Sequence, residues 1–152
     1  MPTFTRLLAL LLFSAAAFLL SEQFQRLDEE IPPSVAASVW LALIAAPVGW
    51  KLVGTRIGTS YLRGLSIVIQ GYIATFLLGL LFSGIVDVFR GGYRMRYKTF
   101  TDVFTALFTD MQKHLEQMLD RDFLTLVAVS ICVIAVALVA VFRISEARRY
   151  AQ

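Results

Sequence analysis

The sequence has little of several residue types that define other classes of protein. Of its 152 residues, 16% are charged, four are proline, nine are glycine and one, Cys132, is cysteine. A single cysteine excludes an intrachain disulfide scaffold, and the scarcity of proline and glycine excludes a collagen-like chain. Because soluble domains carry about 25% charged residues, this chain has too few charges to cover a soluble surface.

Hydrophobic residues are abundant instead. They make up 58% of the chain, and the mean hydropathy is +0.72. The remaining class is the integral membrane protein. The net charge of +3 does not indicate nucleic-acid binding, because almost all of the Lys and Arg residues stand at the ends of apolar runs, as they do around membrane spans.

Four apolar runs approach or reach the length of about 20 residues that a membrane span requires. They predict one all-α membrane domain over residues 1–152, with spans at about 4–21, 35–53, 65–86 and 123–142. The first run also fits a signal peptide cleaved after Ala15-Ala16-Ala17, but its apolar residues continue to Leu20, which favours a retained span. A polar connector is expected from Ser21 to Ser34, and Pro47 predicts a kink in the second span.

The stretch at about 100–119 has a two-faced pattern. Its apolar residues recur at helical spacing, and they are Phe100, Phe104, Leu107, Phe108, Met111, Leu115 and Met118. The opposite face is polar, and Thr99 with Asp102 resembles a capping box. We therefore expect an amphipathic helix in the interface plane of the membrane.

Two groups of residues are candidate contact sites. Small residues stand at every fourth position of the third run and predict a close helix–helix contact; they are Gly71, Thr75, Gly79 and Ser83. A substrate groove along the same face is the alternative. The basic residues that follow this run are expected to contact lipid headgroups; they are Arg90, Arg94, Arg96 and Lys98.

No combination of residues predicts a catalytic centre. The chain offers no Ser/His/Asp set, carboxylate pair or phosphate loop. We therefore predict no catalytic residue, no cofactor and no metal site, and we do not expect an enzyme. The only histidine, His114, shares a helix surface with two methionines; an interfacial histidine is favoured over a contact to a soft metal.

Three further polar residues lie in or beside the apolar runs. Cys132 is expected in the middle of the fourth span, where apolar surroundings make a thiol inert, and helix packing explains it. Asp87 is expected at headgroup level beside Arg90 or Arg94, although an intramembrane carboxylate is a functional candidate by default. Gln70 is expected to make an inter-helix hydrogen bond.

Several short motifs follow one another along the chain in an order that is typical of a known family. They are Met1-Pro2-Thr3 with Arg6-Leu7, Ser21-Glu22, Val48-Gly49-Trp50, Gly54, Arg56, Gly58, Tyr61, Leu81-Phe82, Arg96-Tyr97 and Glu146 with Arg148-Arg149. In these motifs the chain resembles the TrgA-type tellurite-resistance membrane proteins over essentially its whole length. It departs from their pattern at Lys98-Thr99-Phe100, where a proline or glycine is expected. The resemblance implies a small bacterial inner-membrane protein associated with tellurium resistance, and it brings no active site.

The functional hypothesis follows from the resemblance and the residues together. It is a non-enzymatic inner-membrane protein that acts in oxyanion or envelope stress resistance through lipids or partners; the alternative is a subunit of a small oligomeric transporter or efflux system. Membrane lipid is the expected partner, a homo-oligomer or another membrane protein stays open, and nucleic acid is not expected. Both termini are expected in the cytoplasm, because the basic residues of the short connectors favour that side. When the long connector after the third run is counted too, the two sides of the membrane carry equal numbers of Lys and Arg residues.

Overall fold

A computed structural model of the chain describes residues 4–27, 34–93 and 118–145, together with scattered residues between 101 and 116. Of residues 87–93 it describes the backbone alone. The elements are helices throughout, and no strand occurs in the described part: α1 (Phe4–Arg26), α2 (Val35–Pro47), the π-helix η1 (Val48–Val53), α3 (Tyr61–Tyr93) and α5 (Arg121–Ser145).

Four helical segments are long and apolar enough to cross a membrane. They are Phe4–Arg26, Val35–Val53, Tyr61–Val86 and Arg121–Ser145. At a rise of about 1.5 Å per residue, α1 is about 35 Å long, enough for a hydrocarbon layer of about 30 Å. The outward faces of the four segments carry large apolar side chains, which suit lipid rather than water; examples are Leu43, Leu77 and Val133. The prediction of an all-α, multi-pass membrane protein is confirmed.

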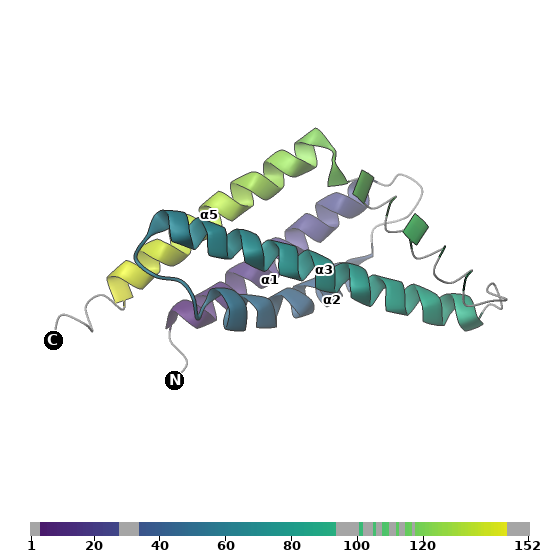
Figure 1. Cartoon of the computed structure of the whole chain (residues 1–152), viewed down its shortest axis with the longest axis horizontal. Helices are drawn as coiled ribbons and strands as arrows, with labels where there is room; N and C mark the ends of the chain where they lie inside the picture. The colour runs from purple at the N-terminus through teal and green to yellow at the C-terminus, as the bar shows by residue number, and fades with distance from the viewer. Residues whose placement is uncertain are drawn as a thin grey trace.

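The helices form one bundle (Figure 1). α1 packs against α2, η1 and α5, while α3 packs against α5, η1 and α2. The beginning of α1, the turn between η1 and α3, and the end of α5 lie together at one end of the bundle. The end of α1 and the beginning of α5 lie together at the other, where the rings of Phe24 and Phe123 stack edge to face with centroids 5.7 Å apart.

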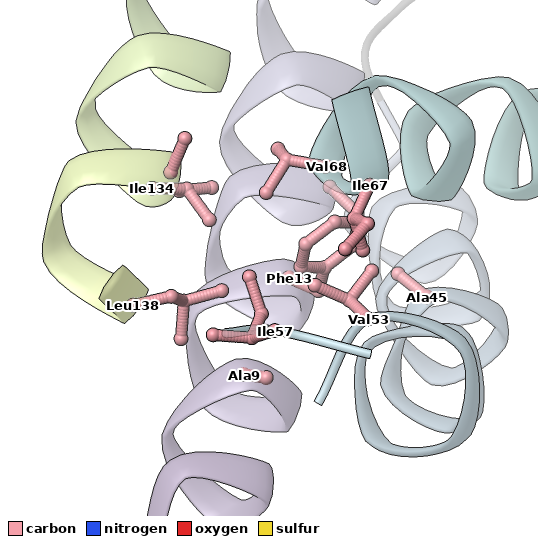
Figure 2. Packing of buried hydrophobic residues seen from close by; sticks show 11 residues of the cluster. Ala9, Phe13, Ala45, Val53, Ile57, Ile67, Val68, Ile134 and Leu138 are labelled. Atoms are coloured by element: carbon pink, nitrogen blue, oxygen red, sulfur yellow. The ribbon is translucent and has the colours of Figure 1, made fainter. Parts of the chain in front are cut away.

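The core lies between these helices and is built from apolar side chains of every element (Figure 2). Phe13 of α1 stands in its centre and is 2% exposed, with Val53 of η1, Val68 of α3 and Leu138 of α5 fully buried around it. Phe13 also meets Tyr72 of α3 edge to face, with ring centroids 5.3 Å apart. The bundle is therefore closed by packed side chains where its helices meet.

The first helix is longer than its sequence predicts. A connector was expected from Ser21, yet α1 continues to Arg26. Nothing between Ser21 and Arg26 breaks a helix, and the extra turn is held to α2 by side-chain hydrogen bonds. Gln25 donates to the Ser38 hydroxyl (2.9 Å), and its carbonyl oxygen accepts the backbone N–H of Ser34. The polar residues after the apolar run therefore fasten α1 to α2 instead of forming a loop.

The expected kink at Pro47 takes the form of a change of helix type. α2 ends at Pro47, and η1 continues directly from it as a π-helix, so that Gly54 donates to the carbonyl of Gly49, five residues back. Proline has no N–H to donate, so the α-helical hydrogen-bond ladder loses a member there and the next turn is free to widen. This widened turn brings Gly49 and Val53 against α1 and α3.

Candidate functional site

Two places in the bundle bring together side chains from several segments. The first is the glycine junction, which we define as Ala9 and Phe13 of α1, Gly49 and Val53 of η1, and Gly71 of α3. The second is the cationic end, which we define as Arg6, Lys51, Arg56, Arg63 and Arg143, at the end of the bundle where α1 begins.

Gly49 permits a close approach to the backbone of α1 in the glycine junction. A Cβ on Gly49 would lie 2.6 Å from the Ala9 carbonyl oxygen and 2.8 Å from the Cβ of Phe13. Because both obstacles belong to or adjoin the backbone of α1, they cannot rotate away. One turn later, Gly54 also faces α1, with its Cβ position 2.9 Å from the Cα of Arg6. Gly49 and Gly54 therefore let η1 lie directly on α1.

Gly71 permits a close approach from the α3 side of the same junction. Its Cβ position is 2.6 Å from a methyl carbon of Val53 and 2.8 Å from the ring of Phe13. The aromatic ring thus occupies the space that a side chain on α3 would take, as its central place in Figure 2 suggests. Small residues on three segments and one large ring make up this contact.

The other small residues at every fourth position of α3 lie outside the glycine junction. Gly79 faces α2, where a Cβ would lie 2.7 Å from a methyl carbon of Leu41. Thr75 is 8% exposed and donates its hydroxyl to the carbonyl of Gly71 (2.9 Å), so its polarity is satisfied inside its own helix. Ser83 is partly buried. The structure thus brings Gly71 and Gly79 against two different segments, η1 and α2.

Tyr72 and Ser130 form a polar contact between α3 and α5. The Tyr72 hydroxyl donates to the Ser130 hydroxyl (3.0 Å), which donates to the carbonyl of Val127 (2.8 Å). Such a chain of donors leaves no unpaired hydroxyl hydrogen at this contact. Sequence reasoning missed this pair, because nothing in either residue's local pattern indicates which helix it faces.

Replacing Tyr72 with phenylalanine is expected to lower the free energy of unfolding in detergent by about 0.6 kcal/mol, and by no more than about 1.7 kcal/mol, the range for polar contacts between membrane helices. The Tyr61→Phe variant is the matched control, since Tyr61 is an exposed tyrosine at the start of α3. Steric trapping or thermal unfolding measures the free energy of unfolding of both variants. Equal losses in the two variants would show that the Tyr72 hydroxyl contributes nothing.

At the cationic end, Arg143 ties α5 to the turn before α3. Its Nε and Nη2 atoms both donate to the carbonyl oxygen of Thr59, at 2.9 and 2.6 Å, and its guanidinium lies over the ring of Tyr61, 4.4 Å from the centroid. The planar guanidinium serves both contacts at once. Arg143 directly follows the predicted fourth span at about 123–142, and its local sequence does not reveal this role.

The Arg143→Gln variant is expected to loosen the turn at Thr59 and to cost about 1 kcal/mol of stability, from a charge-assisted hydrogen bond and a cation–π contact at an exposed site. Faster amide hydrogen exchange over residues 57–60 measures the loosening. Arg63→Gln is the control, because Arg63 is also an exposed arginine near the same turn. Unchanged exchange in Arg143→Gln would contradict this role.

The expectation for Cys132 is wrong, and the hydrogen bond expected for Gln70 is not formed within the described part of this chain. Cys132 is exposed on the outer face of α5 and does not serve helix packing within the chain. Gln70 is exposed on α3, and it makes no inter-helix hydrogen bond to any residue that the structure describes. Both residues point away from the core because the buried positions of their helices, such as Ile67 and Gly71 beside Gln70, lie on another face.

Several predicted site residues lie wholly or partly outside the described residues. Of the headgroup candidates, Arg90 is described as backbone within α3, and the other three lie outside; Asp87 is likewise described as backbone only. His114 lies outside too. Of the predicted amphipathic face, Phe108 and Leu115 are helical and exposed, and Met118 is helical and partly buried, while the others lie outside. The amphipathic helix at about 100–119 therefore stays a prediction.

The contacts described above are those of helix packing. Among them, no group of three or more His, Cys, Asp or Glu side chains is placed to hold a metal ion. Comparison with known proteins finds no matching family model, no matching curated protein and no matching solved structure. The functional argument therefore rests on the geometry and on the sequence resemblance alone.

Proposed function

We propose that the chain is a non-enzymatic protein of the bacterial inner membrane that takes part in tellurite or envelope stress resistance through contacts with lipids or partner proteins. The observation that carries the proposal is the role of the glycines that also carry the resemblance. Gly49 and Gly54 both lie where η1 meets α1, at distances that only glycine permits. The shared motif residues thus support an assembly of helices rather than a reaction centre.

The cationic end supports the proposed orientation, with both termini in the cytoplasm. Arg6, Lys51, Arg56, Arg63 and Arg143 lie at or near this end, and no acidic side chain accompanies them among the described residues there. At the opposite end, the basic residues Arg26 and Arg121 are accompanied by the acidic residues Glu22, Asp120 and Asp122. Basic residues gather on the cytoplasmic side of membrane proteins and are attracted there by anionic lipid.

A deletion strain challenged with tellurite tests the proposal. We expect the deletion to raise sensitivity, the wild-type chain and the Gly58→Ala variant to restore resistance, and the Gly49→Leu variant to fail. Gly58 is the matched control, since a Cβ there would meet nothing within 4 Å. Unchanged sensitivity of the deletion strain would refute the stress function while leaving the fold intact.

Flux measurements in vesicles separate this proposal from the transporter alternative. The proposal predicts no flux of tellurite or other anions that depends on the protein, because the described core is filled with apolar side chains such as Phe13, Val68 and Leu138. Protein-dependent flux would favour a subunit of an oligomeric transporter.

A further inference from the structure

The outward face of α3 carries a glutamine within a membrane span. The helix buries Ile67, Val68, Gly71 and Thr75, and the opposite face is exposed. On that opposite face, five exposed residues recur at steps of three and four and so form one stripe along the helix. We call them the Gln70 stripe: Ser66, Gln70, Ile73, Leu77 and Leu81.

Gln70 is too deep to reach water. The uncharged part of the span runs from Leu65, after Arg63, to Val86, so roughly 8 Å of helix separates Gln70 from its nearer end and roughly 24 Å from its farther end. Neither distance can be bridged by a glutamine side chain. The amide therefore lies in the hydrocarbon layer, where polar groups are normally satisfied by the protein itself.

The amide of Gln70 has no partner among the residues that the structure describes. It offers two N–H donors and a carbonyl acceptor. Its neighbour in the stripe, Ser66, differs in this respect, because the Ser66 hydroxyl donates to the carbonyl of Leu62 within the helix (3.2 Å). Gln70 is thus the member of the stripe whose hydrogen-bonding capacity is open to another molecule.

We propose that the Gln70 stripe is the interface between two copies of this chain, in which the Gln70 amides of the two copies pair with each other. A primary amide is self-complementary, since each can donate an N–H to the carbonyl oxygen of the other. Two copies inserted in the same direction are related by a two-fold axis along the membrane normal, and this axis keeps every residue at its own depth. In such a dimer, each Gln70 amide therefore lies at the same depth as the Gln70 amide of the other copy.

The apolar residues of the Gln70 stripe also fit a second copy of the chain. Ile73, Leu77 and Leu81 continue from Gln70 along α3, and each is apolar and more than half exposed. In a two-fold dimer these side chains pack against their own counterparts, so that apolar residues flank the amide pair. The proposal requires only that α3 spans the membrane, and it does not depend on the proposed stress function.

Disulfide trapping in vesicles locates the interface. In a Cys132→Ala background, which removes the only cysteine, we expect oxidation of Leu77→Cys to give a covalent dimer in vesicles of phosphatidylethanolamine and phosphatidylglycerol. Leu43→Cys on α2 is the matched control and is expected to stay monomeric, since Leu43 is 57% exposed and Leu77 is 56% exposed. Equal trapping at both positions, or none at Leu77→Cys, would overturn the proposal.

Energy transfer between labelled copies in the same vesicles tests the amide pair itself. Gln70→Leu is expected to raise the dissociation constant of the dimer about tenfold, as the loss of paired polar contacts between membrane helices implies. Gln23→Leu is the control for the same chemical change at an exposed position of α1 and is expected to leave association unchanged. Unfolding of the Gln70→Leu monomer is expected to match the wild type. A dissociation constant within twofold of the wild type would overturn the proposal.

Discussion

Replacing Gly49 with leucine is expected to lower the free energy of unfolding by about 3 kcal/mol, the upper end of the usual range for overpacked sites. The reason is that the added Cβ alone would lie 2.6 Å from the Ala9 carbonyl oxygen. Relief requires η1 to move away from α1, and this motion also separates Val53 from Phe13. Thermal or denaturant unfolding in detergent, followed by circular dichroism, measures the loss.

A graded series of glycine-to-alanine variants controls for the change of residue. The expected order of destabilisation is Gly49, then Gly71, then Gly79, then Gly58. A Cβ meets backbone at Gly49, a ring and a valine methyl at Gly71, one flexible leucine methyl at Gly79, and nothing within 4 Å at Gly58. Equal effects at Gly49 and Gly58 would contradict the claim that Gly49 sets the distance between η1 and α1.

The Phe13→Ala variant is expected to lower the free energy of unfolding by about 3–5 kcal/mol, the range for truncation of a buried aromatic residue. Phe13 is 2% exposed, stacks edge to face on Tyr72 and fills the space above Gly71. Removing its ring therefore leaves a cavity where α1, η1 and α3 meet. The same unfolding measurement applies, and a loss below about 1 kcal/mol would show that the junction collapses at little cost.

A second substitution shows whether the ring and the glycine share one space. Gly71→Leu alone is expected to destabilise the protein, because a side chain there meets the ring of Phe13. In the Phe13→Ala background the leucine can enter the vacated volume, so the double variant is expected to be more stable than the sum of the single losses predicts. Strict additivity would mean that the two residues do not compete for one space.

The apolar helices could be predicted from the sequence because their signal is local. Runs such as Val35–Val53 are apolar over the length of a span, and length and hydropathy suffice to identify them. The end of α1 could not be predicted in this way. Gln25 continues the helix because it hydrogen-bonds Ser38 and Ser34, two residues that only the folded chain brings beside it.

The glycine junction could be predicted only in part, because its contacts also join residues that only the folded chain brings together. The four-residue spacing singled out Gly71 and Gly79, but not the partners that they meet. Gly49 lies in a π-helix that follows Pro47, and a simple α-helical periodicity does not place its face. Cys132 and Gln70 point outward for a related cause: hydropathy shows that a residue is in a span, but the direction it faces depends on neighbours in other helices.

The most direct test of the account is the accessibility of single cysteines from each side of the membrane. In the Cys132→Ala background, we predict that a membrane-impermeant maleimide labels Arg56→Cys from one side and Leu119→Cys from the other, because the turn after η1 and the start of α5 lie at opposite ends of the bundle. Val133→Cys, exposed in the middle of α5, is expected to react from neither side. Labelling of Arg56→Cys and Leu119→Cys from the same side would contradict the four-span bundle.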